Sequence, residues 1–231
     1  MSSKQKGFYM ILAGIVILAL KLSFNTGLDL YGEYQTDYSV GSEFQAYTLN
    51  YFYGANTDIY EGVSLDVYYT GFQINIFSNI IGYGLIIIGT LKLKELSKLF
   101  SLTGFMSWIG MALYILIKFL PFFLNGYRLC YIALFIGIAE LFATLSVMYL
   151  FVYAVCTILN DVAFKQDRAY IGICYIGTAI CMIVVAFINW LATVNKGLVM
   201  VYEILCLGVI ALLIYNLYKV KDFILKERGL E

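Results

Sequence analysis

The chain contains no histidine, and charged residues make up only 13% of its 231 residues. Without histidine it lacks the commonest general base, so Ser–His and Cys–His catalytic pairs are excluded. The P-loop, H-E-x-x-H and G-x-S-x-G motifs are also absent. We therefore expect no catalytic residue, no metal site and no cofactor, and we predict that the protein is not an enzyme.

Cysteine is sparse and gives little support for redox chemistry. All five cysteines lie in apolar segments, and no C-x-x-C motif occurs. A disulfide framework or a thiol redox site is therefore not expected. Cys174 and Cys181 share a helical face with Thr178, and such a face is more often a packing surface than a metal site.

The low charge content points to a membrane protein. Soluble domains carry about 25% charged residues, whereas this chain has 62% hydrophobic residues and a mean hydropathy of +0.84. The formal net charge is zero, and no basic face suits a nucleic acid. The expected partner is therefore the lipid bilayer, with no nucleic acid.

Six apolar stretches are long enough to cross a bilayer as helices. The sequence predicts an all-α fold, a polytopic transmembrane helical bundle in which residues 1–231 form a single integral membrane domain. The first stretch resembles a signal peptide, but Lys21 follows it without an A-x-A cleavage site, which favours an uncleaved span. The predicted spans are approximately 7–25, 72–91, 101–124, 129–159, 170–194 and 198–218.

The basic residues predict how these spans are threaded. With the N-terminus inside, eleven lysines and arginines fall on the inner side, and only Arg128 and Lys196 fall on the outer side. Positive residues favour the cytoplasmic side of a membrane. We therefore predict that both termini are cytoplasmic and that segment 25–71 is an extracytoplasmic loop.

The segment 25–71 is acidic and rich in tyrosine. It holds seven carboxylates and nine tyrosines, and no basic residue occurs between Lys21 and Lys92. Either a short β-hairpin or a lid of short helices is compatible with its glycines and its β-like tyrosine run 47–53. One interpretation is a solvated loop whose tyrosines join the interfacial aromatic belt. The other is a surface that binds a protein partner or a small solute.

Four ionisable residues lie inside the predicted spans: Lys21, Lys118, Glu140 and Glu203. Such residues are costly in lipid and normally face the bundle interior. The lysines belong to the first three spans and the glutamates to the last three, which predicts a polar pocket that opens outward between the two halves. Two structural ion pairs, or snorkelling lysines with one protonated glutamate, explain the same residues.

Glu140 is the deepest of the four, near the middle of its span. It shares a helical face with small side chains, which is typical of a surface that contacts another helix. These side chains are Ala133, Gly137, Ala143 and Thr144.

The run Ile76–Gly89, with Lys92 and Ser97 after it, resembles a family of small bacterial six-span membrane proteins. Their second span typically reads D-x-x-P-D-F-I-G-Y, followed by an aliphatic run, G-L and K-L-S. Here Ser78 and Asn79 stand where that family has Pro-Asp. The resemblance implies a multi-pass protein of the bacterial cytoplasmic membrane, and it implies no mechanism.

Three functional hypotheses follow from the sequence. The first is a small-solute carrier, or a solute-binding membrane component, with an outward-facing polar pocket. The second is a non-catalytic membrane subunit or sensor whose outer loop binds a partner. The third, an intramembrane enzyme, is disfavoured because Glu140 and Glu203 are the only acidic residues in the spans.

Overall fold

The computed structural model describes residues 2–20, 25–37, 66–75, 79–120, 123, 126–159, 164–191 and 196–226. In these residues the protein forms six helices and one two-stranded sheet. The elements in chain order are α1 (Ser3–Leu20), β1 (Asn25–Asp37), β2 (Asp66–Asn75), α3 (Asn79–Leu93), α4 (Lys98–Phe119), α5 (Gly126–Ile158), α6 (Lys165–Leu191) and α7 (Lys196–Lys226).

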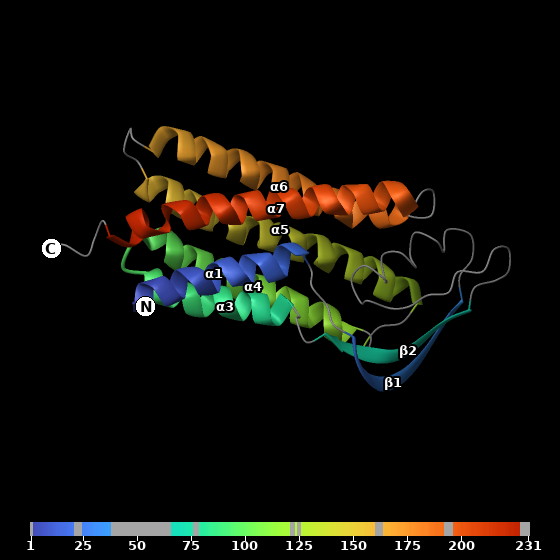
Figure 1. Ribbon diagram of the computed structural model, residues 1–231. Coiled ribbons are helices and arrows are strands. Elements are labelled where there is room, and N and C mark those ends of the chain that lie inside the picture. Colours follow the sequence, from blue (N-terminus) through green and yellow to red (C-terminus); the bar gives the residue numbers. More distant parts are fainter. Residues whose placement is uncertain are drawn as a thin grey trace.

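The helices lie side by side along one long axis (Figure 1). The start of α1 and the end of α7 lie at one end of the bundle, together with the turn between α3 and α4. The sheet lies at the other end. This arrangement is compatible with the prediction that the two termini share one side of the membrane.

Four helices contain segments long and apolar enough to cross a membrane, which fits a helical membrane protein. The segments are Lys98–Ile117, Phe135–Ile158, Lys165–Val184 and Ile204–Leu225. Helix α3 is apolar but shorter. The two further spans predicted from the sequence, in the regions of α1 and α3, therefore stay a prediction.

Helices α1 and α3 pack against each other at glycines. A Cβ atom added at Gly14 would lie 2.6 Å from the carbonyl oxygen of Gly82, and one added at Gly89 would lie 2.6 Å from that of Gly7. Within each helix the two glycines are seven residues apart and so share one face. The backbones can approach closely because these positions carry no side chain.

The apolar core lies among α1, α3, α4 and α5 and extends to side chains of α6 and α7. The ring of Phe151 lies 5.7 Å from that of Phe8 and 6.0 Å from that of Phe100, measured between centroids. All three rings are fully buried. Residues 140, 144, 148, 151 and 155 follow one face of α5, and all are buried.

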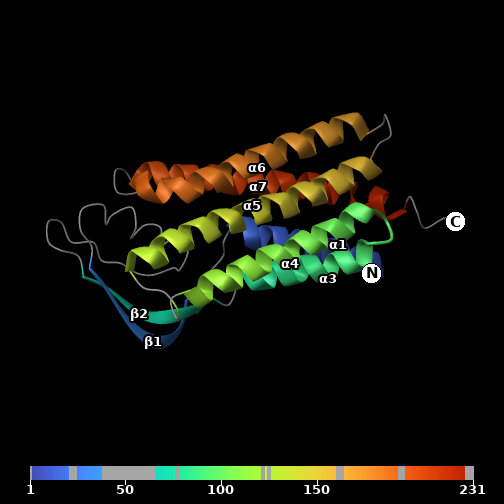
Figure 2. The same cartoon turned by 180° about the vertical axis from the view of Figure 1, so that it is seen from behind.

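Helices α6 and α7 form a hairpin that adds side chains such as Ile171, Leu213 and Leu217 to this core. In both views α5 lies between α4 and α6 (Figures 1 and 2). Large apolar side chains on α6, including Ile173, Ile176 and Ile180, are exposed in the isolated chain. Exposed apolar side chains at this spacing suit a helix face turned toward lipid.

Strands β1 and β2 join the two ends of the acidic segment. They pair antiparallel from Asn25 opposite Asn75 to Asp37 opposite Asp66, with two irregularities in register. Of the two loop architectures expected, the β-hairpin agrees with this pairing. The tyrosine run 47–53 lies outside the described residues.

The predicted start of the second span is wrong. Residues 72–75 belong to β2, and α3 begins at Asn79. Six of the ten residues 66–75 are β-branched or aromatic, which suit a strand, and pairing with β1 satisfies their backbone groups. The alternation of Phe72 and Ile74 with Gln73 and Asn75 also has the period of a strand.

Candidate functional site

Glu140 is buried between helices inside the candidate span of α5, with 3% of its surface exposed. Its carboxylate oxygen Oε1 accepts a hydrogen bond from Asn79 Nδ2 at 3.0 Å and one from the Tyr83 hydroxyl at 2.8 Å. Thr144 Oγ1 lies 3.3 Å from the same oxygen. We call these four residues the Glu140 centre.

The two hydroxyl groups of the Glu140 centre also contact each other. Tyr83 Oη and Thr144 Oγ1 are 2.5 Å apart, and either atom can be the donor. Thr144 Oγ1 also lies 3.0 Å from the backbone carbonyl oxygen of Glu140, where it can donate a hydrogen bond. Glu140, Tyr83 and Thr144 thus form a closed cluster of oxygen atoms.

The local sequence explains why these side chains converge. Asn79 and Tyr83 are four residues apart on α3, and Glu140 and Thr144 are four apart on α5, so each pair lies on one helix face. The ring of Tyr83 lies against α4 at Gly110, where an added Cβ would come within 2.5 Å of ring carbons. Three helices therefore fix the position of the Tyr83 hydroxyl.

Among the described side chains, the hydrogen-bond donors around Glu140 are neutral, and Glu140 makes no ion pair with them. Tyr114 of α4 lies beside the carboxylate and contacts the backbone of Asn79. Asn79 is the first residue of α3, and the N-terminus of a helix carries a partial positive charge that favours a nearby carboxylate.

Of the predicted site residues, the structure describes only the side chain of Glu140. Lys21 lies outside the described residues. Lys118 and Glu203 have described backbone in α4 and α7, but their side chains do not belong to the described part. The expected charge pairing therefore stays a prediction.

The contact face predicted around Glu140 is confirmed where the structure describes it. Gly137, Ala143 and Thr144 are buried, and the side chain of Ala133 is outside the described residues. Asn79 and Tyr83 were missed as partners. Their four-residue spacing within an apolar run is the signal that could have identified them.

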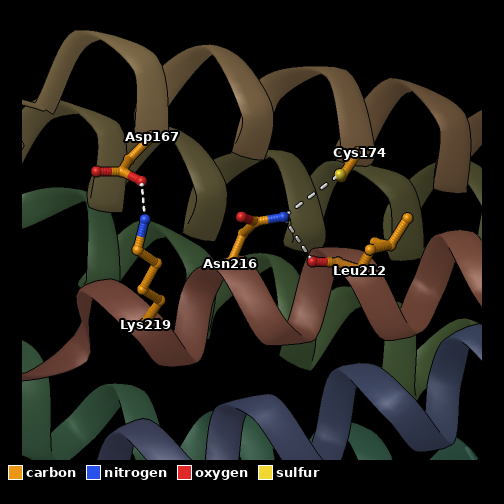
Figure 3. Close-up of polar contacts among 5 residues, drawn as sticks. All are labelled: Asp167, Cys174, Leu212, Asn216 and Lys219. Carbon is orange, nitrogen blue, oxygen red and sulfur yellow. Dashed lines mark hydrogen bonds and ion pairs between the residues drawn. The ribbon is translucent and has the colours of Figure 1, made fainter.

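A second group of polar contacts joins α6 to α7 (Figure 3). The Lys219 ammonium donates to Asp167 Oδ1 at 2.9 Å. Farther along α7, Asn216 Nδ2 donates to the Leu212 carbonyl at 2.8 Å and contacts Cys174 Sγ at 3.7 Å. These groups are partly exposed, which distinguishes them from the Glu140 centre.

The contacts of Cys174 agree with a packing role for its helix face. Thr178 is fully buried and donates to the Cys174 carbonyl at 2.9 Å, as is common in apolar helices. Among the described residues, no group of three or more histidine, cysteine, aspartate or glutamate side chains could hold a metal ion.

Comparison with known proteins gave no match: no family model, no curated protein and no solved structure is significantly similar to the chain.

Proposed function

We propose that the protein is a multi-pass carrier, or a solute-binding component of one, in the bacterial cytoplasmic membrane, and that its solute or coupling ion acts at the Glu140 centre. Six spans with both termini in the cytoplasm complete the proposal. The observation that carries it is a carboxylate buried in an apolar helix and bonded only to neutral donors among the described residues.

The energetic cost of such a group supports a function rather than packing alone. A carboxylate within hydrocarbon costs roughly 3 kcal/mol on insertion scales, so it persists mainly where an ion or a solute uses it. An apolar side chain of similar volume would fill the same space without this cost. Tyr83 is fully buried and covers the carboxylate, so the Glu140 centre is closed in this conformation.

A thermal-stability screen tests the carrier proposal. Protein purified in mild detergent is heated with amino acids, sugars, nucleosides or organic acids, because a ligand at 100 times its Kd stabilises the folded state by about 2.7 kcal/mol. We expect one class to raise the Tm of the wild type and of Glu95→Gln, a control in the exposed turn after α3. The same class should leave Glu140→Gln unchanged.

Two results of that screen would count against the carrier proposal. One is that no solute class raises the Tm of the wild type. The other is that the active class stabilises Glu140→Gln as much as it stabilises the wild type, because the solute would then bind elsewhere.

Thiol labelling tests the threading. In a cysteine-free version, a cysteine at Ser42 should react with a membrane-impermeant reagent in intact cells. A cysteine at Gln166, in the exposed first turn of α6, should react only after lysis. The reverse pattern would invert the orientation, and labelling of both residues in intact cells would change the number of spans.

The sheet favours a second candidate function, a membrane subunit whose outer segment binds a protein. Strands β1 and β2 pair only with each other among the described residues, so each has an edge that could accept another strand. Detergent purification followed by mass spectrometry should recover a stoichiometric partner from wild-type cells. Deletion of residues 25–71 should lose that partner while the chain still inserts into the membrane.

A further inference from the structure

We infer that the Glu140 centre takes up and releases a single proton, with Glu140 as the proton-binding group and Tyr83 and Thr144 as the positioning residues of a short relay. This inference deepens the proposed function and rests on it for the link to transport. The step is one of simple protonation: the carboxylate gains one proton from hydronium in water to become a carboxylic acid and returns it to water on release, with no other net change in covalent bonds.

The ligand geometry suits a proton better than a metal ion. Oxygen-ligated cations such as Ca²⁺ and Mg²⁺ take about six or more oxygen ligands. Here Oε1 already accepts from Asn79 and Tyr83, and these donors point hydrogen atoms, not lone pairs, at the carboxylate. The buried carboxyl group can carry one proton on Oε1, which can then donate to Tyr83 without further ligands.

Counting protons shows that the cluster has an arrangement for each charge state. With Glu140 ionised, Thr144 donates to Tyr83 and Tyr83 donates to Oε1, which uses the contacts of 2.5 and 2.8 Å. With a proton on Oε1, all three hydroxyl groups donate in sequence. Glu140 then donates to Tyr83, Tyr83 to Thr144, and Thr144 to the Glu140 carbonyl at 3.0 Å.

Reversal of these hydrogen bonds needs rotation of hydroxyl hydrogens and no movement of heavy atoms. Protonation can therefore be accommodated while the packing of α3 against α5 is kept. A buried site that must gain and lose a proton benefits from such a cluster, because the polar atoms stay hydrogen-bonded in both the ionised and the protonated form.

The groups that face Glu140 can be named element by element. Tyr83 faces it from α3, Tyr114 lies beside it from α4, and Thr144 belongs to its own helix. The buried side chains of α1 in the core, such as Ile11 and Ile15, are apolar. Among the described side chains no lysine or arginine pairs with Glu140; the side chains of Lys21 and Lys118 lie outside the described residues.

Toward the end of the bundle that carries the termini, the relay stops at Thr144. The next residues on this face of α5 are Met148 and Phe151, which are fully buried. The buried hydroxyls of Thr103 and Ser107 on α4 each donate to a carbonyl of their own helix at 2.8 Å. No hydrogen bond among the described residues links them to the Glu140 centre.

Infrared difference spectroscopy tests proton binding directly. Spectra of the purified protein are recorded over a pH range of about 4 to 9, which covers exposed and buried protein carboxyls. We expect a carboxylic-acid C=O band that declines as pH rises, that is absent from Glu140→Gln, and that persists in Glu95→Gln. If subtraction of the Glu140→Gln spectra removes no pH-dependent band, the inference is wrong.

A labelling experiment separates a proton from a metal cation. Dicyclohexylcarbodiimide reacts with protonated carboxyls in apolar surroundings, and peptide mass spectrometry locates the adduct. Labelling of Glu140 should fall as pH rises and should not depend on Na⁺ or K⁺ at constant pH. Protection by either ion at constant pH would overturn the inference in favour of a cation site.

Two variants test whether Tyr83 and Thr144 position the proton. Tyr83→Phe removes a donor to the carboxylate, which disfavours the ionised form, so the carboxylic-acid band should persist to higher pH than in the wild type. Thr144→Ser keeps the hydroxyl and should keep the pH dependence of the wild type. Tyr149→Phe, at an exposed position on the same helix, is the control. If Tyr83→Phe leaves the pH dependence of the band unchanged, Tyr83 does not position the proton and the inferred relay is wrong.

The outcomes also separate this inference from the carrier proposal. A titrating Glu140 in a protein that no solute stabilises would support the proton centre and overturn the carrier proposal. A solute effect that depends on Glu140, combined with a carboxyl that never titrates, would do the reverse.

Discussion

The unit formed by α1, α3, α4 and α5 differs from the α6–α7 hairpin in how its helices meet. In the four-helix unit, glycines bring backbones into contact, and a carboxylate is enclosed with all its described partners. In the hairpin, a partly exposed ion pair and a weak contact to sulfur join the helices. A Cβ added at Gly177 would lie 2.9 Å from a side-chain carbon of Val209, not from backbone, and Gly172 and Gly208 have no neighbour within 4 Å of an added Cβ.

This difference follows from the physics of packing in lipid. Apolar side chains gain little by leaving lipid for another helix, so close contact and hydrogen bonds decide which helices associate firmly. The four-helix unit has both and can hold the atoms of the Glu140 centre in place. Identical substitutions should therefore cost more in this unit than in the hairpin.

The largest effect is expected for glycine replacement between α1 and α3. Gly14→Ala and Gly89→Ala each place a Cβ 2.6 Å from a backbone carbonyl that cannot rotate away. Overpacking of this kind costs about 2 to 3 kcal/mol. Chemical unfolding in detergent, followed by circular dichroism, measures the free energy of unfolding.

Matched glycines provide the controls for this prediction. Gly84, on the same helix as Gly89, and Gly172 and Gly208 in the hairpin have open space at the Cβ position. Replacement by alanine there should be neutral or should stabilise by up to about 1 kcal/mol, since glycine is a poor helix former. Equal losses at all these positions would show that the two regions do not differ in packing.

A smaller effect is expected inside the Glu140 centre. Glu140→Ala removes the common acceptor of Asn79 and Tyr83 and leaves buried donors unpaired, which costs about 2 kcal/mol. Glu140→Gln keeps an acceptor oxygen and should cost less than about 1 kcal/mol. Thermal unfolding of both variants gives the comparison. A glutamine variant as unstable as the alanine variant would show that the negative charge itself holds the helices together.

The corresponding substitution in the hairpin is Asn216→Ala. Asn216 bonds a carbonyl of its own helix and contacts Cys174 at 3.7 Å, and sulfur is a weak acceptor. Asn216→Ala should lower the free energy of unfolding by about 0.5 kcal/mol, the low end of the range for a hydrogen bond. A loss as large as that of Glu140→Ala, measured in the same detergent, would mean that the hairpin is as firmly joined as the four-helix unit.

Sequence reasoning identified Glu140, the one buried acid among the described side chains, but not its surroundings. Glu140 is recognisable because an ionisable residue in an apolar run has few explanations, and the small residues around it mark a contact face. Asn79 and Tyr83 are ordinary polar residues of another span. Which face of α3 meets α5 depends on tertiary packing, and helix periodicity alone does not specify it.

The glycines and the acidic segment show the same limit. Gly82, Gly84 and Gly89 are equivalent in sequence, yet only the first and last meet α1. The start of α3 was misplaced because Phe72 and Ile74 were joined to the apolar run that follows, although their alternation with Gln73 and Asn75 has the two-residue period of a strand. Residues 72–75 belong to β2 because they pair with residues 25–30 of β1, more than 40 residues earlier in the chain.

The smallest effect is expected at the ion pair between α6 and α7. Lys219 and Asp167 are 2.9 Å apart, but the Lys219 side chain is 58% exposed. Water and salt screen such pairs, and the order imposed on two side chains offsets part of the attraction. Lys219→Met should therefore lower the Tm only slightly, and the difference from the wild type should vanish at high salt. Asp167→Asn should lower the Tm by a similarly small amount. If the two side chains interact only with each other, the Tm of the double variant should be no lower than that of either single variant.

A large decrease in Tm that persists at high salt would show that the ion pair holds α6 and α7 together strongly. The hairpin would then not differ in stability from the glycine-packed helices.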